Sequence, residues 1–462
     1  MTTRLKICAH VPLLLSLCGC MVGPNYKRPA VAVPGQYRGA TPATSSQPSS
    51  GQPFGEMRWE SVFQDQVLQG LIKQALTNNY DLRIAATRVL EANANLGIVR
   101  ANQLPTVSGA YGLEYTRTPL MPKATAFNTL LLPSINYIVD FWGQYRRATQ
   151  SARATLLATQ YGQSVVQTTL ISSVASDYFL LGQYDSQLQY STETVAVDKD
   201  ILQLNTTKFK GGDASLMDVY QAQVLLQQAE AQVINLRQLV EQTENNISIL
   251  LGDNPGPIAR GLSLTEQPHM PEVPAGLPST LLERRPDVRS AEENLVAANA
   301  NVGVAKAAFF PQISLTGQFG ASAAISGFLQ GPAAFWTVGG QVTQPIFEGG
   351  RIRSNYRLAW AERDEAELIY KQTVLDAFGD VSNSLVGYYQ AQKYRMKLED
   401  QTKTYKDAAH LANVRFQGGY ASFLEVLIME QDYFISELDL AAAWYAEMAN
   451  YVQLYQSLGG GW

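Results

Sequence analysis

The sequence predicts an α+β membrane protein in which each chain combines four strands with very long helices. Three observations support this fold class: an internal tandem duplication, two runs in each copy that alternate between apolar and polar residues, and long proline-free stretches with heptad spacing. With 46% hydrophobic and 16% charged residues, the chain has the composition neither of a bundle of apolar membrane helices nor of a disordered protein.

Residues 1–19 are predicted to be a signal peptide. A short basic start precedes the apolar stretch 7–17, which is too short to span a bilayer as a helix. The stretch ends in Leu17-Cys18-Gly19-Cys20, which resembles a bacterial lipobox, so we expect Cys20 to be lipidated. The alternative is an ordinary cleavage site beside an incidental cysteine. Met21 rather than Asp follows Cys20, and the resemblance therefore implies sorting to the outer membrane.

The mature chain is expected to consist of five segments. Pro, Ser, Gly, Thr and Ala dominate the stretch from Pro29 to about Pro53, which predicts an extended segment rather than a core. The predicted segments are a lipidated N-terminal extended tether (20–63), a first structural repeat (64–258), a linker (259–280), a second structural repeat (281–455) and a Gly-rich tail (456–462).

The duplication is visible directly in the sequence. Asp81-Leu-Arg-Ile-Ala85 recurs 206 positions later as Asp287-Val-Arg-Ser-Ala291. Phe209-Lys-Gly-Gly-Asp-Ala-Ser recurs 207 positions later as Phe416-Gln-Gly-Gly-Tyr-Ala-Ser. Because chance similarity would not hold its register over such a distance, the chain is interpreted as one unit written twice.

Each unit begins with a predicted Ala-rich helical segment, about 64–103 in the first copy and 281–308 in the second, which a proline ends. Two strands are expected to follow in each copy. Val107, Gly109 and Tyr111 alternate with smaller or polar neighbours, as in a strand with one apolar and one polar face. The predicted strands are about 107–116, 134–141, 313–319 and 336–346.

Strands of about 9–11 residues can cross a bilayer when tilted, but transmembrane barrels need at least about 8 of them. Four strands per chain cannot close a barrel, and backbone groups in lipid must all be paired. The chain is therefore expected to form a homotrimer with a 12-stranded transmembrane β-barrel. The alternative is a soluble pair of hairpins packed on helices.

Very long helices are predicted after the strands, because no proline occurs between Pro133 and Pro255 or after Pro345. An uninterrupted helix of about 65 residues would be on the order of 100 Å long. Apolar residues spaced by 3 and 4 predict coiled-coil packing. They are Leu226, Ala229, Val233, Leu236, Val240, Thr243, Ile247 and Leu250, and in the second unit Phe434, Leu438, Ala441, Tyr445, Met448, Val452 and Tyr455. The pairs Gly211-Gly212 and Gly418-Gly419 are expected to reverse one helix into the next.

Composition argues against several function classes. The net charge of −5 disfavours a nucleic-acid partner. The three His are far apart and all three Cys lie within the first twenty residues, so neither a metal site nor a disulfide framework is expected. No nucleophile–base constellation or phosphate-binding loop is recognisable. We therefore expect no enzyme activity and no cofactor.

The order of helix, two strands, long helix, turn and helix, repeated behind a lipobox, resembles the TolC family of outer-membrane efflux proteins. The likeness is greatest to its OprM-like (NodT-type) lipoprotein branch. The segments Val22-Gly-Pro-Asn-Tyr-Lys-Arg-Pro29, Glu283-Arg-Arg-Pro-Asp287 and Phe309-Phe-Pro311 look like motifs of that branch.

The resemblance implies a trimeric β-barrel in the outer membrane, continuous with a long periplasmic α-helical barrel. It also implies an exit duct that passively exports drugs or small toxic compounds, delivered by an inner-membrane RND pump through a periplasmic membrane-fusion adaptor. The alternatives are the duct of a type I protein secretion system and a coiled-coil, envelope-spanning structural lipoprotein.

The resemblance further implies a periplasmic gate just beyond the turn glycines. The matching residues are the acids Asp218 and Glu425, with Leu424 as an apolar constriction, and the glycine turns would contact the adaptor. The alternative is that each acid is a solvated residue in the first turn of a helix, where negative charge is favourable. Ala421 and Ser422 leave no basic partner in the second turn, so we expect closure to depend on Leu424 and Phe423.

Overall fold

A computed structural model describes residues 21–38, 54–117, 125–268, 273, 278–324 and 333–462. The chain divides into two compact units. Unit 1 consists of the described part of Met1–Ala30 together with Thr87–Gln160 and Ser290–Gln372, and unit 2 of the described parts of Val31–Ala86, Tyr161–Arg289 and Thr373–Trp462. Both sequence repeats contribute to each unit, so neither unit corresponds to one repeat.

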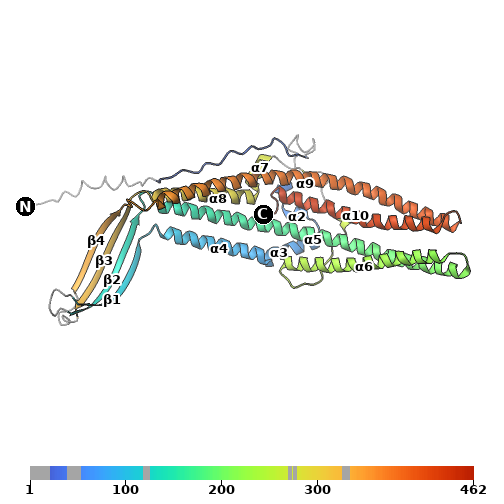
Figure 1. The fold of residues 1–462 in the computed structure, drawn as a ribbon, viewed down its shortest axis with the longest axis horizontal. Coiled ribbons are helices and arrows are strands. Elements are labelled where there is room, and N and C mark those ends of the chain that lie inside the picture. The colour runs from blue at the N-terminus through green and yellow to red at the C-terminus, as the bar shows by residue number, and fades with distance from the viewer. Residues whose placement is uncertain (1–20, 39–53, 118–124, 269–272, 274–277, 325–332) are drawn as a thin grey trace, which may run out of the picture. The chain divides into compact units, whose positions relative to one another are not determined.

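Unit 1 contains one antiparallel sheet, in which the strands lie side by side in the order β1-β2-β3-β4 (Figure 1). The strands are β1 (Thr106–Arg117), β2 (Thr125–Val139), β3 (Gln312–Ala324) and β4 (Ala333–Thr343). The four strands confirm the alternation found in the sequence, although β2 and β3 are longer than predicted. The pairing of β2 with β3 joins the two repeats, with Tyr137 opposite Leu315.

The long helices confirm the interpretation of the proline-free stretches. Helix α5 (Gln144–Gly211) has 68 residues and α9 (Arg351–Gln417) has 67. Each is followed by a helix of about half that length, α6 (Leu216–Leu251) and α10 (Phe423–Ser457), shown in green and red in Figure 1. Buried positions on α6 and α10 include Ala229, Leu236 and Val240, then Ala441 and Met448, in agreement with the heptad pattern.

The shorter helical segments differ from the prediction, because each is interrupted once. The first consists of α3 (Gln66–Asn78) and α4 (Tyr80–Ala101), and the second of α7 (Pro278–Arg284) and α8 (Pro286–Ala307). Asn79 leaves the helical conformation, with ψ 131°, and its side-chain oxygen accepts a hydrogen bond from the Leu82 amide at 3.0 Å, which starts α4. Pro286 starts α8, since proline has no amide hydrogen and is favoured at the first helical position.

Unit 2 has an aromatic core and a buried polar centre. Two short helices, η1 (Phe54–Glu56) and α2 (Trp59–Val62), lie in the segment that the sequence assigned to the tether. The Phe54 ring lies 5.0 Å from the ring of Tyr451 and 5.4 Å from that of Tyr455. Among the described residues, no helix combines the length and the apolar character that a membrane span requires.

The polar centre of unit 2 is Asp65, which is 2% exposed. Its carboxylate accepts hydrogen bonds from the Tyr178 hydroxyl (2.8 Å), the Leu262 amide (2.9 Å) and the Gln267 side chain (2.9 Å). Burial by itself raises the pKa of Asp65, but the hydrogen bonds lower the pKa by more than burial raises it. The pKa of Asp65 therefore lies below its usual value. The loop of η2 (Leu264–Glu266) is thereby held against α5.

Candidate functional site

The two predicted turns reverse the long helices as expected, but only one glycine of each pair needs its special conformation. Gly212 has φ 84° and Gly419 has φ 79°, whereas Gly211 and Gly418 are not in the left-handed region. The amides of Gly212 and Gly419 each donate to the carbonyl three residues earlier, at 3.1 and 3.0 Å. The next amide in each turn donates to the carbonyl five residues earlier, which completes the hydrogen-bond pattern of a Schellman motif.

Asp218 lies in the first turn of α6 and forms a capping box with Ser215. The Ser215 hydroxyl accepts a hydrogen bond from the Asp218 amide at 3.2 Å, and the Asp218 carboxylate accepts one from the Ser215 amide at 2.8 Å. Ser215 is exposed and Asp218 is half-buried. The carboxylate therefore satisfies the helix start and lies where the positive end of the helix dipole favours it.

Glu425 occupies the matching position in α10 but contacts a base. Its carboxylate lies 3.0 Å from the guanidinium of Arg415, in the last turn of α9. The expectation that the second turn has no basic partner is therefore wrong, because the partner comes from the helix before the turn. The residue that matches Arg415 in the first repeat is Lys208, whose amine lies 4.3 Å from the centre of the Phe416 ring instead.

Leu424 and Phe423 have different surroundings. Phe423 is buried in an apolar cluster with Ala222 and Val426, whereas Leu424 is 52% exposed. Leu424 and Met217, the residues directly before the two acids, line one shallow groove of about 320 Å³. The structure thus brings the starts of α6 and α10 together and presents an apolar surface there.

Cys20 lies outside the described residues, but the segment after it is firmly held in unit 1. The guanidinium of Arg147, a residue only 2% exposed, donates to the carbonyl of Val22 at 3.2 Å and to the Asn25 side chain at 3.0 Å. The Val22 amide donates to the carbonyl of Trp142 at 3.1 Å. The segment from Met21 to Asn25 is therefore bound where β2 passes into α5.

The same segment also binds the second repeat through α8. Glu292 accepts hydrogen bonds from the Tyr26 hydroxyl at 3.1 Å and from Arg28 at 2.6 Å. Gly23 packs so tightly that a Cβ atom there would lie 2.5 Å from the Cα of Gly303. We call residues 21–28 with these contacts the N-terminal clasp, and it ties the segment to both repeats.

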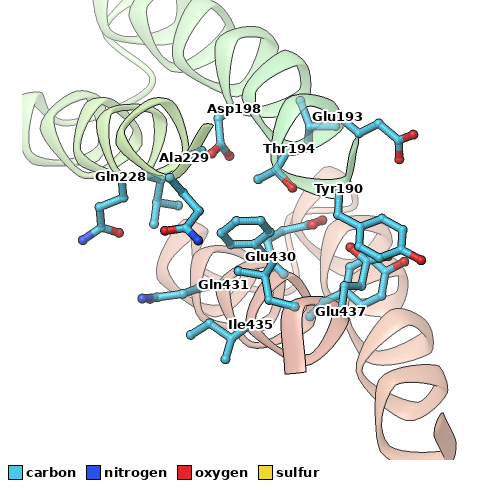
Figure 2. Close-up of a pocket in the computed structure, with 16 residues that line it drawn as sticks. Tyr190, Glu193, Thr194, Asp198, Gln228, Ala229, Glu430, Gln431, Ile435 and Glu437 are labelled. Carbon is cyan, nitrogen blue, oxygen red and sulfur yellow. The ribbon is translucent and has the colours of Figure 1, made fainter. Parts of the chain in front are cut away.

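An acidic pocket of about 450 Å³ lies between α5, α6 and α10 in unit 2 (Figure 2). Its four charged lining residues, Glu193, Asp198, Glu430 and Glu437, are all acidic. Asp198 is 5% exposed, and burial followed by the charge of Glu430 raises its pKa to about 6. Burial also raises the pKa of Glu430 and Glu437.

Sequence reasoning missed Arg415, Arg147 and the acidic pocket. Arg415 could have been found by aligning the repeats one residue before Phe416, where Lys208 shows that a base recurs. Arg147 and Asp198 carry no local signal, because their surroundings come from distant parts of the chain. Among the described residues, no three or more His, Cys, Asp and Glu side chains converge in a way that could hold a metal ion.

Comparisons with known proteins agree with this architecture. The chain matches the outer membrane efflux protein family over residues 71–253 and again over 277–460, one match for each repeat. It is 34% identical over 466 residues to the solvent efflux pump outer membrane protein SrpC of Pseudomonas putida, covering 97% of both chains. It is 31% identical over 465 residues to the cation efflux system protein CusC of Escherichia coli, again covering 97% of both.

Solved structures show the same fold. A crystal structure of CusC superposes with a TM-score of 0.86 at 28% identity, over 96% of this chain and 100% of that one. The outer-membrane channel OprN gives a TM-score of 0.86 at 29% identity with the same coverage. The predicted fold class is thereby confirmed: a duplicated chain that supplies four strands to a trimeric β-barrel and long helices to an α-helical barrel.

The relatives are outer-membrane components of efflux pumps, so the predicted outer-membrane location and the role of exit duct are confirmed. Efflux channels of this kind are trimers that work with periplasmic adaptors and inner-membrane pumps. With one family match to each repeat and full-length relatives above 30% identity, the chain belongs to the outer membrane efflux protein family.

Proposed function

We propose that this chain is the lipid-anchored exit duct of a tripartite efflux system whose inner-membrane pump is of the RND class. Its cargo would be drugs or small toxic organic compounds. The names of the relatives support this cargo class, since they include solvent, toluene and antibiotic efflux pumps, although CusC is named for cation efflux. The duct itself supplies no energy, and the pump selects the cargo.

The anchor in this proposal is Cys20, exposed as the first residue after removal of residues 1–19. The observation that supports it is the N-terminal clasp, which begins one residue later at Met21. Gly143, with φ 78°, allows Met21 to pack against it, and a Cβ there would lie 2.7 Å from the Met21 side chain. A lipid on Cys20 would therefore start close to the end of β2, and each buried CH₂ would add about 0.8 kcal/mol of membrane affinity.

The gate in this proposal is formed by the starts of α6 and α10. Asp218 and Glu425 would give six carboxylates in a trimer, which favours cations, and Leu424 would narrow the passage. The groove lined by both Leu424 and Met217 supports the gate proposal, because the starts of α6 and α10 meet at this one apolar surface. The turns at Gly211, Gly212, Gly418 and Gly419 would then contact the adaptor.

Single-channel recordings of the purified trimer in planar bilayers test the duct and its gate. Asp218→Ala combined with Glu425→Ala should reduce the cation preference, and Leu424→Ala should raise the leak conductance. Glu241→Ala, which removes an exposed acid from the C-terminal part of α6, is the matched control and should change neither. Unaltered recordings from both test variants would refute the gate, and a wild type that never conducts would refute the duct.

The anchor needs a separate measurement. Intact-mass analysis of the wild type should find a diacylated N-terminus at Cys20, and Cys20→Ala should leave a precursor that retains residues 1–19. An unmodified mature N-terminus in the wild type would contradict the anchor without affecting the gate.

A further inference from the structure

The acidic pocket contains a carboxylate that has no partner within the described chain and whose oxygens open onto the pocket. Asp198 comes from α5 and, in Figure 2, is directed into the space enclosed by α5, α6 and α10. It is 5% exposed, and within the described residues its carboxylate has neither a hydrogen-bond partner nor an ion-pair partner. Confining an ionised carboxylate in such a site without a charge partner is costly, and a cation bound in the pocket would stabilise it.

The other charged groups around Asp198 do not supply that charge. Glu430 on α10 faces it and repels it. Lys199, the neighbour of Asp198 on α5, pairs with Glu230 of α6 at 3.5 Å on the exposed side. The remaining titratable groups that face the pocket are Glu193 and Tyr190 on α5, Tyr433 and Glu437 on α10, and Lys406 of α9, which acts on Glu437. The lining side chains of α6 are uncharged.

The walls of the pocket favour an organic cation over a metal ion. Among the described residues, no three acidic side chains converge closely enough to ligate one metal. Tyr190, Tyr433 and Phe434 add aromatic rings to the lining, and aromatic faces attract ammonium and guanidinium groups. The volume of about 450 Å³ lies within the range of about 300–1,000 Å³ that is typical for small-molecule pockets.

We propose that the acidic pocket is a binding site for a small organic cation, an alkylammonium or related amine, which Asp198 and Glu430 contact as charge partners. The ammonium group would lie between the two carboxylates and its alkyl part against the aromatic rings. This inference goes beyond the duct and the gate and does not depend on either. It adds a ligand site in the wall of the helical part.

Binding at this site must depend on pH in a definite direction. The pKa of Asp198 is raised to about 6 in the empty pocket, and a bound cation would lower it by stabilising the ionised form. Occupation would therefore release protons near pH 6. Affinity should be high above that pH and should fall as the pH drops below it, because protonated carboxyls do not pair with a cation.

Calorimetric titration of the purified trimer with butylammonium chloride tests the proposal, with sodium chloride and butanol as ligand controls. Saturable binding is expected at about pH 7.5 and its loss is expected at about pH 5. Asp198→Asn and Glu430→Gln should each weaken binding by at least about tenfold, because one partner of a buried charge pair is lost. Repeating the titration near pH 6 in buffers of different ionisation enthalpy should show net proton release.

The matched control is Asp200→Asn, the same chemical change two residues away on the exposed side of α5, which should bind as the wild type does. A second readout needs no ligand. Asp198→Asn should raise the melting temperature of the trimer at about pH 7.5, where it removes a destabilising negative charge, but not at about pH 5, where Asp198 is already neutral. No saturable binding by the wild type, undiminished binding by Asp198→Asn, or an equal loss in Asp200→Asn would overturn the proposal.

Discussion

The turn from α5 to α6 and the turn from α9 to α10 share a sequence pattern and a backbone, yet they use their acids differently. Gly212 and Gly419 hold the same left-handed conformation, and Ser215 and Ser422 both cap the next helix. In the first turn, Asp218 folds back on Ser215 and closes a capping box. In the second, Glu425 instead reaches Arg415 across the turn.

The two copies of the motif have diverged in their side-chain contacts without a change of fold. Aspartate is one methylene shorter than glutamate, so its carboxylate stays close to its own helix start. The longer glutamate reaches the guanidinium of Arg415 on the preceding helix. That guanidinium has several N–H donors in one plane, so one of them can point toward the Glu425 carboxylate. The side-chain amine of Lys208, the matching base of the first repeat, lies over the Phe416 ring instead.

Replacing the left-handed glycines should have the largest effect and should affect both turns alike. Gly212→Val or Gly419→Val should destabilise its turn by about 1–2 kcal/mol or more, because β-branched residues are strained at positive φ. Hydrogen exchange of peptides covering each turn would measure the loss. Gly211→Val is the control, since Gly211 is helical and a Cβ there would meet no atom closer than 3.7 Å. Equal protection in all three variants would show that the backbone conformation is not what holds the turns.

Removing the helix caps should separate the two turns. Ser215→Ala should weaken the start of α6 by about 1 kcal/mol, since the Ser215 hydroxyl both accepts from the Asp218 amide and donates to the Asp218 carboxylate, and only the bond from the Ser215 amide remains. Ser422→Ala should weaken the start of α10 less, because its glutamate keeps Arg415. Amide exchange in the first turn of each helix reports the difference, and a larger loss in α10 would contradict the comparison.

Breaking the ion pair should affect only the second turn. Arg415→Met should reduce local stability there by about 0.2–1 kcal/mol, and the effect should shrink at high salt because the pair is exposed. Lys208→Met is the matched control in the first repeat and should leave exchange at Ser215 to Asp218 unchanged. A double-mutant cycle of Arg415→Met with Glu425→Gln should give a coupling energy within the same range, and zero coupling would refute the pair.

Exchanging the acids should have the smallest effect. Asp218→Glu should keep its capping box, since glutamate also serves at this position, whereas Glu425→Asp should lose contact with Arg415 at a cost of a few tenths of a kcal/mol. Exchange rates at the two helix starts, measured at low and high salt, would distinguish these outcomes. A salt-dependent change in the first turn would show that its aspartate is not locally capped.

Much of the fold could be read from the chain because it depends on local periodicity. Alternation around Val107 predicts a strand, the absence of proline after Pro133 and Pro345 predicts helices of great length, and the glycine pairs predict their reversal. These patterns act over a few residues at a time, and the backbone responds to them in the same way wherever they occur. The interruptions at Asn79 and Pro286 were missed, since one residue in the middle of a periodic run changes the periodicity very little.

The repeats, the elements and the positions of the two acids at helix starts are therefore encoded locally. The pairing of β2 with β3, the bond from Arg147 to the carbonyl of Val22, the ion pair of Arg415 with Glu425 and the placement of Asp198 beside Glu430 depend on tertiary packing. Each of these contacts joins elements whose approach depends on how the whole chain packs. The free energy of such a contact comes from burial and charge at the final distance, which no local pattern in the sequence encodes.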